Sequence, residues 1–169
     1  MIPPSPWVVR HLAHVPAGGR ILDLACGSGR HARWLAAQGR EVLAVDRDLA
    51  ALAGLQGVPG IAVLAADLET DDWPLAGCQF AGVVVTNYLW RPRLADVLAL
   101  LAPGSVLIYE TFMVGNEAWG KPSNPAFLLR PAELREAARA AGLRELAFAE
   151  GYVDSPKPAM RQAICAVRA

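Results

Sequence analysis

The sequence predicts an α/β fold: one doubly wound domain built on a seven-stranded, mostly parallel sheet with one antiparallel strand near the C-terminus. Apolar runs of strand length alternate with segments of helical periodicity, the pattern of a parallel sheet with helical crossovers. Hydrophobic residues make up 54% of the chain and charged residues 19%, which suits a sheet buried on both faces. Because 169 residues fit one domain, we expect residues 1–169 to form a single unit.

The first half of the chain contains four apolar runs that we expect to be strands. They span residues 21–25, 41–45, 61–65 and 80–86. Between the first two, Ala32, Leu35 and Ala36 share one helical stripe, which predicts a helix over residues 30–38. Gly39 follows at the position where a left-handed residue closes a helix.

Three further helices are expected from their capping residues. Asp48 can cap a short helix that runs through Leu55, because Asp side chains accept hydrogen bonds from first-turn amides. Pro92 and Pro131 each stand where a proline opens a helix. The helix after Pro92 should bury one apolar stripe, formed by Leu94, Val97, Leu98 and Leu101.

The last part of the chain predicts three more strands and one irregular segment. The strands span residues 105–111, 143–149 and 162–167. The loop between the last two, residues 151–160, is short for a parallel crossover, so those strands should be antiparallel. Residues 112–130 are rich in Gly, Asn and Pro but also hold Trp119 and Phe127, which argues against disorder. We therefore expect a lid or substrate segment over residues 111–130.

Charge and cysteine content exclude several classes of function. The formal net charge is zero, so no global field favours nucleic acid or an anionic membrane as a partner. Three widely spaced cysteines predict neither a disulfide framework nor a zinc site, and the three histidines lack a cluster that would complete any metal site. The N-terminus lacks the basic region of a signal peptide, and no apolar run reaches the roughly 20 residues of a membrane span, so a cytoplasmic location is expected.

The predicted chemistry lies in the turn after the first strand, Asp23-Leu-Ala-Cys-Gly27-Ser-Gly29. In a doubly wound sheet, ligands bind at the carboxyl ends of the strands, and glycines let a ligand approach the backbone closely. This turn also fits a nicotinamide-dinucleotide fingerprint, with Ala32 at its third position. However, Asp23 would repel a pyrophosphate, whereas a sulfonium or an α-amino group would tolerate it. Asp46 ends the next strand, where a carboxylate accepts ribose hydroxyls in either case.

Residues 21–30 resemble motif I of class I S-adenosylmethionine-dependent methyltransferases. The resemblance extends along the chain, since seven strands with an antiparallel last one match the Rossmann-like fold of that family. The segments 109–112 and 115–117 are similar to small bacterial methyltransferases of the tellurite-resistance type, whose substrates are unassigned. The resemblance implies an enzyme that uses S-adenosylmethionine and releases S-adenosylhomocysteine.

The resemblance also implies a set of cofactor-binding residues. Gly27 and Gly29 would face the methionine and the sugar, and Asp46 would hold the ribose. Asp67 would accept the adenine amino group, and the backbone of Leu68 would reach the ring. The complete expected set is Asp23, Ala25, Gly27, Gly29, Arg30, Asp46, Arg47, Asp67, Leu68 and Asn87.

Several of these residues also have structural alternatives. Asp23 could tie down the turn through backbone amides, Asp46 could cap the following helix, and Asp67 could belong to a solvated acidic loop. Arg30 fits either the carboxylate of the cofactor or an exposed first turn of a helix. A helix around Trp7 could cover the sheet edge, although we expect it to cover the cofactor.

The acceptor is expected to be a small molecule. Motif IV here is Thr86-Asn-Tyr-Leu and not an Asn/Asp-Pro-Pro-Tyr sequence, which argues against methylation of nucleic-acid amino groups. We thus expect no nucleic-acid or membrane partner. Methyl transfer needs a general base only when the acceptor must lose a proton, and the candidates are Tyr88, Tyr109 and Glu110. The alternatives are an NAD(P)-dependent oxidoreductase and a non-catalytic subunit that binds S-adenosylmethionine.

Overall fold

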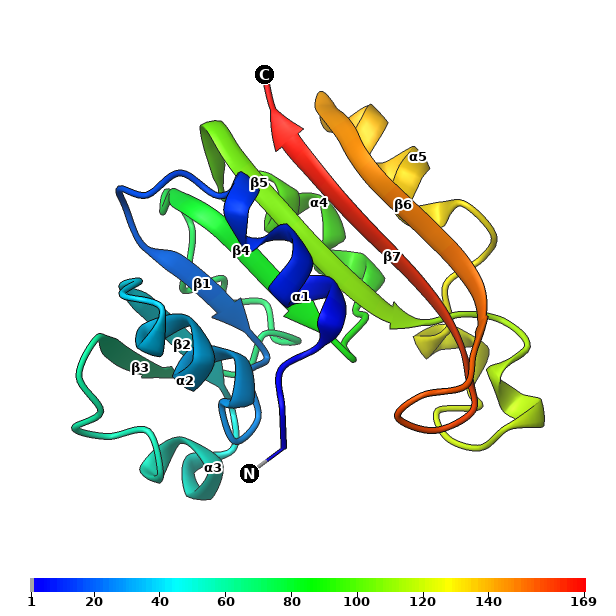
Figure 1. The fold of residues 1–169 in the computed structure, drawn as a ribbon, viewed down its shortest axis with the longest axis horizontal. Helices are drawn as coiled ribbons and strands as arrows, with labels where there is room; N and C mark the ends of the chain where they lie inside the picture. The colour runs from blue at the N-terminus through cyan, green and yellow to red at the C-terminus, as the bar shows by residue number, and fades with distance from the viewer. Residues whose placement is uncertain (1) are drawn as a thin grey trace.

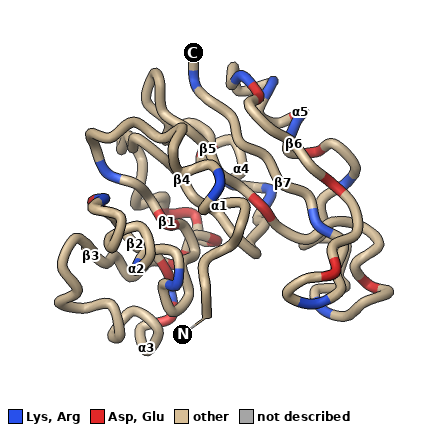
Figure 2. Tube along the Cα trace, in the orientation of Figure 1, with Lys and Arg blue, Asp and Glu red and all other residues tan. Residues whose placement is uncertain are grey.

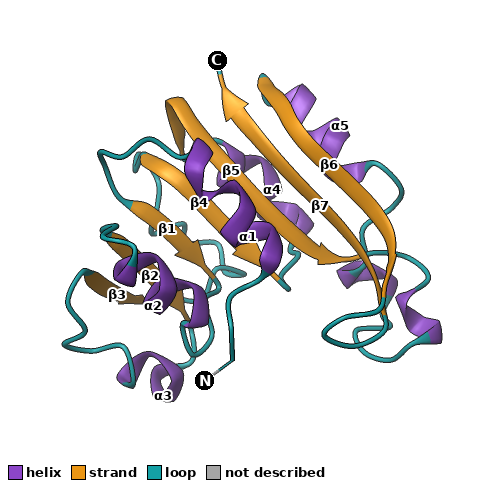
Figure 3. Cartoon of the chain, in the orientation of Figure 1, coloured by secondary structure: helices purple, strands orange, loops and turns teal. Residues whose placement is uncertain are grey.

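The computed structural model describes residues 2–169, so Met1, where the expected domain begins, lies outside the described residues. Its centre is one seven-stranded sheet (Figures 1 and 3). The strands are β1 Ile21–Leu24, β2 Val42–Asp46, β3 Ile61–Ala65, β4 Phe80–Thr86, β5 Leu101–Phe112, β6 Leu143–Val153 and β7 Ala159–Arg168. Every predicted strand is present.

The order of the strands is β3-β2-β1-β4-β5-β7-β6. The pairs from β3 to β5 are parallel, whereas β7 is antiparallel to both β5 and β6. This arrangement confirms the predicted mostly parallel sheet with one antiparallel strand. The direction of strand succession reverses between β1 and β4, which is the switch point where doubly wound sheets bind ligands.

Helices cover both faces of the sheet (Figure 1). They are α1 Pro6–His11, α2 Arg30–Ala37, α3 Leu49–Ala53, α4 Leu94–Leu98 and α5 Glu133–Ala140. Val8 of α1 and Leu35 of α2 pack into the core of one face, and Val97 of α4 and Leu134 of α5 pack into the core of the other. The two apolar layers hold the sheet rigid, so the strand ends present side chains at fixed positions.

Several predicted boundaries are wrong. Leu101 was expected on the helix after Pro92 but begins β5, where it pairs with Phe80 ahead of an irregular register. The strands β6 and β7 both extend beyond the predicted ranges, because their antiparallel ladder continues to the pair Val153–Ala159. The turn is thus confined to residues 154–158 around Pro156, and cross-strand pairing takes up the rest of the predicted loop.

The N-terminal helix α1 packs on the sheet, and Trp7, which was expected to cover the cofactor, contacts β7. Val8 is fully buried in the core under α1, and Trp7 Nε1 donates a hydrogen bond to the carbonyl of Ile164 in β7 (3.1 Å). The indole polar group thus has its partner in the sheet.

Charges of both signs are interspersed along the chain (Figure 2). Within residues 2–169, no helix has both the length and the apolar character that crossing a membrane requires.

Candidate functional site

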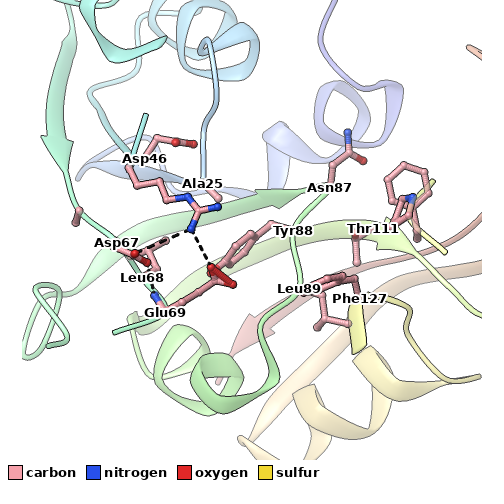
Figure 4. Close-up of a pocket in the computed structure, with 14 residues that line it drawn as sticks. Ala25, Asp46, Asp67, Leu68, Glu69, Asn87, Tyr88, Leu89, Thr111 and Phe127 are labelled. Atoms are coloured by element: carbon pink, nitrogen blue, oxygen red, sulfur yellow. Dashed lines mark hydrogen bonds and ion pairs between the residues drawn. The ribbon is translucent and has the colours of Figure 1, made fainter. Parts of the chain in front are cut away.

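A cavity of about 410 Å³ opens at the carboxyl ends of the strands, beside the switch point (Figure 4). A cavity of this size suits a small ligand. Its walls come from five strand ends and from the irregular segment after β5. The lining residues are Ala25, Asp46, Arg47, Ala66, Asp67, Leu68, Glu69, Asn87, Tyr88, Leu89, Thr111, Phe112, Pro122 and Phe127.

The backbone is strained where β1 and β4 enter this cavity. Ala25 (φ 54°) and Asn87 (φ 55°) are left-handed although neither is glycine, and both line the cavity. Such conformations cost on the order of 1–3 kcal/mol and gather at functional sites. The strain turns the chain sharply out of two neighbouring strands, and it leaves the space between their ends open.

The two glycines of the first turn serve different purposes. Gly27 (φ 56°) has no heavy atom within 4 Å of the position a Cβ would take, so this side of the turn is open to a ligand. Gly29 (φ 83°) packs against Leu55, whose methyl groups would lie 2.6 Å from a Cβ. The structure therefore gives Gly29 a packing role, and neither glycine is among the residues that line the cavity described above.

Asp46, at the end of β2, is hydrogen-bonded to the glycine turn. The amide of Gly27 donates to Asp46 Oδ2 (2.8 Å), and the amide of Asp48 donates to Asp46 Oδ1 (2.9 Å). A carboxylate has about four acceptor positions, so two bonds leave capacity for a ligand in the cavity. The capping role and the ligand role of Asp46 are compatible.

Arg47 lies beside two acidic residues of the cavity wall, Asp67 and Glu69. Its Nη1 lies 3.5 Å from Glu69 Oε2 and 4.0 Å from Asp67 Oδ2, and its side chain is 68% exposed. Ion pairs this exposed are weak, so the guanidinium can move aside at little cost. Glu69 was missed by sequence reasoning, although it stands two positions after Asp67 at the end of β3.

Asp23 lies beneath the turn and is only 1% exposed. Its Oδ2 has no hydrogen-bond partner among residues 2–169, so the expected alternative of a carboxylate tied into the turn does not account for this oxygen. Burial raises the pKa of Asp23 from 3.8 to about 7, a rise that a backbone hydrogen bond from Ala32 and then the Arg30 charge partly oppose. A buried carboxyl with one unpaired oxygen next to an open glycine turn is a natural partner for a cation.

The three candidate bases occupy different environments. Tyr109 is fully buried below the cavity, where its hydroxyl donates to the carbonyl of Tyr88 (2.7 Å), and burial raises its pKa. Glu110 lies 3.8 Å from Arg161 and does not line the cavity. Tyr88 lines the cavity, but burial and then the Glu69 charge raise its pKa to about 12, so it is neutral at pH 7. Of the three candidates, Tyr88 lines the cavity, whereas Tyr109 and Glu110 do not.

Sequence reasoning expected a lid or substrate segment over residues 111–130, but it did not identify which of its side chains line the apolar half of the cavity, and it missed Leu89. Leu89, Thr111 and Phe112 follow from the ends of β4 and β5, whereas Pro122 and Phe127 come from the irregular segment. Apolar residues in loops give no local signal of a pocket, because only the fold brings them to one strand edge.

Residues 113–130 form an anchored wall with two single-turn 3₁₀ helices, Asn116–Ala118 and Pro125–Phe127. Arg91 donates to the carbonyls of Pro125, Ala126 and Leu128, at 3.3, 3.1 and 2.6 Å. The same guanidinium forms a bidentate pair with Glu133 (2.7 and 2.8 Å). Arg91 thus fixes the backbone on both sides of Phe127.

The N-terminal residues are bound to the start of α2. Arg30 Nη1 donates to the carbonyl of Pro3 (3.1 Å), so this expected cofactor residue is engaged outside the cavity. The buried His31 accepts a hydrogen bond from the amide of Ser5 through Nε2 (3.0 Å), and burial lowers its pKa from 6.5 to about 4. His31 therefore acts as a neutral structural acceptor.

Within the described part of the chain, no three His, Cys, Asp or Glu side chains gather as a metal site would require. The three cysteines, Cys26, Cys78 and Cys165, are free thiols.

Comparison with known sequences points to one family. The model of a family described as "Methyltransferase domain" matches residues 21–104, about half of the chain. A tRNA U34 carboxymethyltransferase from Methylococcus capsulatus is 32% identical over 112 residues, and the match covers 60% of this chain and 35% of that protein. The chain thus spans about a third of the length of that curated relative.

Solved structures share the fold over almost the whole chain. TehB from Haemophilus influenzae has a TM-score of 0.77 at 17% identity, covering 96% of this chain and 61% of TehB. An S-adenosylmethionine dependent methyltransferase from Mesorhizobium loti has a TM-score of 0.74 at 21% identity, covering 96% of each chain. At these identities the likeness shows the fold.

Proposed function

Because the chain belongs to the class I S-adenosylmethionine-dependent methyltransferase family, we propose that it binds S-adenosylmethionine in this cavity and transfers the methyl group to a small acceptor. The observation that carries the proposal is the set of carboxyl groups around the open glycine turn. Asp46 and Asp67 line the cavity, and the unpaired Asp23 lies beneath it.

The residues present fit the cofactor. The free acceptor positions of Asp46 suit the two ribose hydroxyls, and Asp67 with the backbone of Leu68 suits the adenine edge. Asp23 is the nearest unpaired acceptor for a positively charged α-amino group, which would favour its ionised form. The absence of a side chain at Gly27 leaves room for the ligand against the turn. NAD(P) fits less well, because its pyrophosphate would meet Asp23.

The proposed mechanism is an in-line displacement in which the protein supplies position. The bound cofactor supplies an activated methyl group with a neutral leaving group. Phe112, Pro122 and Phe127 would bound the acceptor side and exclude water, and alignment of this kind can supply about 7–11 kcal/mol. Tyr88 stays protonated at neutral pH, so it would donate or accept a hydrogen bond and would not act as a base.

The proposal that the acceptor is a small molecule rests on the shape and chemistry of the apolar half of the cavity. Its walls include Leu89, Phe112 and Phe127, and a small molecule with an apolar body fits such walls. The name of the Methylococcus capsulatus relative makes tRNA the competing acceptor. We also propose a cytoplasmic location, because free thiols are typical of a reducing compartment.

The cofactor is tested by calorimetric titration of the purified protein with S-adenosylmethionine, S-adenosylhomocysteine and NAD(P). Binding of the first two, weakened at least about tenfold by Asp46→Ala, is expected from the loss of charge-assisted ribose bonds. Binding of NAD(P) alone would identify an oxidoreductase instead. Tight S-adenosylmethionine binding without turnover on any acceptor would identify a non-catalytic subunit.

The acceptor class is tested with methyl-tritiated S-adenosylmethionine. The protein is incubated separately with a pool of small metabolites and with total tRNA. Label in the small-molecule fraction is expected. Label only in the tRNA fraction would contradict a small acceptor while leaving the cofactor proposal intact.

A further inference from the structure

Arg161 at the start of β7 occupies a position that the proposed methyl transfer does not use. It pairs in register with Phe112 of β5, and its side chain is only 16% exposed. The guanidinium carbon lies 4.6 Å from the centroid of the Phe112 ring, so the charged group stacks on an aromatic wall residue of the cavity.

The guanidinium also contacts a second residue of the cavity. Arg161 Nη2 donates to Asn87 Oδ1 (2.7 Å), and Asn87 is the strained residue at the end of β4. Within residues 2–169, the other nitrogens of this guanidinium donate no hydrogen bond. Because Arg presents five N–H donors in a planar fork, most of this capacity is unused.

The local charge balance around Arg161 is positive. Glu110 Oε1 lies 3.8 Å from Nη2, beyond hydrogen-bond distance. The positive charge of Arg30 repels the positive charge of Arg161. Two guanidinium groups therefore accompany one carboxylate. Burial and the Arg30 charge lower the pKa of Arg161, so an additional anion here would offset an existing cost.

The two ends of the cavity differ in charge. The acidic residues Asp46, Asp67 and Glu69 lie at one end, and Asn87 and Thr111 lie at the other (Figure 4). Arg161 is not itself among the lining residues, but it adjoins that second end through its contacts with Asn87 and Phe112. A cofactor held by the acidic end would place its acceptor toward Arg161.

We propose that Arg161 binds a carboxylate group of the methyl acceptor, so that the acceptor is a small carboxylic acid with an apolar body. This inference rests on the proposed function. The planar fork of Arg161 matches the two oxygens of a carboxylate, and the apolar body would lie against Phe112 and Phe127. A dianionic phosphate would exceed the single net positive charge of the group.

The test uses protein saturated with S-adenosylhomocysteine and four neutral or anionic probes. Benzoate and acetate are titrated calorimetrically, each against its amide, benzamide and acetamide, with inorganic phosphate as a further anion. We expect the carboxylates to bind at least about tenfold more tightly than their amides, as charge-assisted bonds require. Benzoate should bind more tightly than acetate because of the aromatic wall.

Two variants of Arg161 and one control variant test whether Arg161 is the residue that binds the carboxylate. Arg161→Met should weaken benzoate binding at least about tenfold, and Arg161→Lys, which keeps the charge but not the fork, should have an intermediate effect. Arg144→Met, at an exposed arginine on β6, should bind benzoate like the unmodified protein. Circular dichroism checks the fold of each variant, and Arg161→Lys keeps the test decisive if Arg161→Met does not fold.

Several outcomes would overturn the inference. These are equal binding of acids and amides, tighter binding of phosphate, no binding of any probe, or benzoate binding unchanged in both Arg161 variants. A tenfold loss of S-adenosylhomocysteine affinity in Arg161→Met would assign the guanidinium to the carboxylate of the cofactor instead. Failure of the unmodified protein to bind S-adenosylhomocysteine would refute the proposed function, and this inference with it.

Discussion

Asp46 combines a structural and a proposed ligand role in one side chain. Its two oxygens accept the amides of Gly27 and Asp48, so Asp46→Ala leaves two backbone donors without their partner. We expect a loss of about 1–3 kcal/mol in the free energy of unfolding, together with the loss of cofactor affinity. Chemical denaturation and calorimetry measure the two effects.

The neighbouring Asp48 provides the control for that prediction. Asp48 caps α3 by accepting the amide of Ala51 (3.1 Å) and does not line the cavity. Asp48→Ala should cost about 1 kcal/mol of stability and leave cofactor affinity unchanged. Equal losses of affinity in both variants would show that Asp46 acts only through the fold of the turn.

Asp23 predicts a pH dependence of stability. Its pKa is 3.8 unfolded and about 7 folded, so the folded chain binds more protons between these values and stability falls as pH rises from about 4 to 7. Asp23→Asn should remove this decline, which is on the order of a few kcal/mol. Denaturant titrations at several pH values measure it. Parallel pH profiles for both proteins would argue against an ionising Asp23.

At the scale of elements, His31 links the N-terminal segment to α2. Its pKa is 6.5 unfolded and about 4 folded, so the unfolded chain binds more protons in this window. The stability that neutral His31 contributes is therefore present above pH 6.5 and is lost as pH falls toward 4. We expect the hydrogen-exchange protection factors at residues 5–11, which correct for the intrinsic pH dependence of exchange, to fall over this range.

The matched variant is His31→Leu, which removes the acceptor of the Ser5 amide. It should destabilise the protein by about 1–3 kcal/mol and abolish the acid dependence at residues 5–11. Protection factors that fall at low pH in the variant as well would assign the effect to other groups, such as the neighbouring His11 and His14.

Arg91 controls the wall formed by residues 113–130. Arg91→Lys loses the fork that binds three carbonyls and Glu133, so the segment around Phe127 should loosen. We expect a cost of roughly 1–3 kcal/mol and a higher KM for the acceptor, with cofactor affinity little changed. Arg135→Met, which breaks an exposed ion pair with Glu145, should change neither the KM for the acceptor nor the affinity for the cofactor. A larger effect on the cofactor than on the acceptor would contradict this division of the cavity.

At the scale of the whole molecule, the cavity joins strand ends that are distant in sequence. A ligand that binds only the folded chain stabilises it by mass action, by about 2.7 kcal/mol at a concentration of 100 times Kd. S-adenosylhomocysteine should therefore raise Tm in unmodified protein and much less in Asp46→Ala. Equal shifts in a thermal denaturation assay would show binding outside the proposed site.

The sequence by itself determined the architecture and the carboxylates of the proposed cofactor site. Strand and helix positions follow from local apolar periodicity and from caps such as Asp48 and Gly39. The carboxyl ends of parallel strands meet at one edge, so the turn at Gly27 and the carboxylates Asp46 and Asp67 were predicted to lie together. These signals come from residues that are close together in the sequence, so they can be read from a single sequence.

Only the tertiary structure decided which side chains form the acceptor half of the proposed site. Tyr109 and Glu110 are adjacent in β5, but alternation directs one into the buried core and the other toward Arg161 on the opposite face. Arg161 and Phe127 approach Asn87 and the cavity through β7 and an anchored loop, contacts that no local spacing encodes. Burial and partners at long range set the roles of these side chains, and both arise only when the chain is folded.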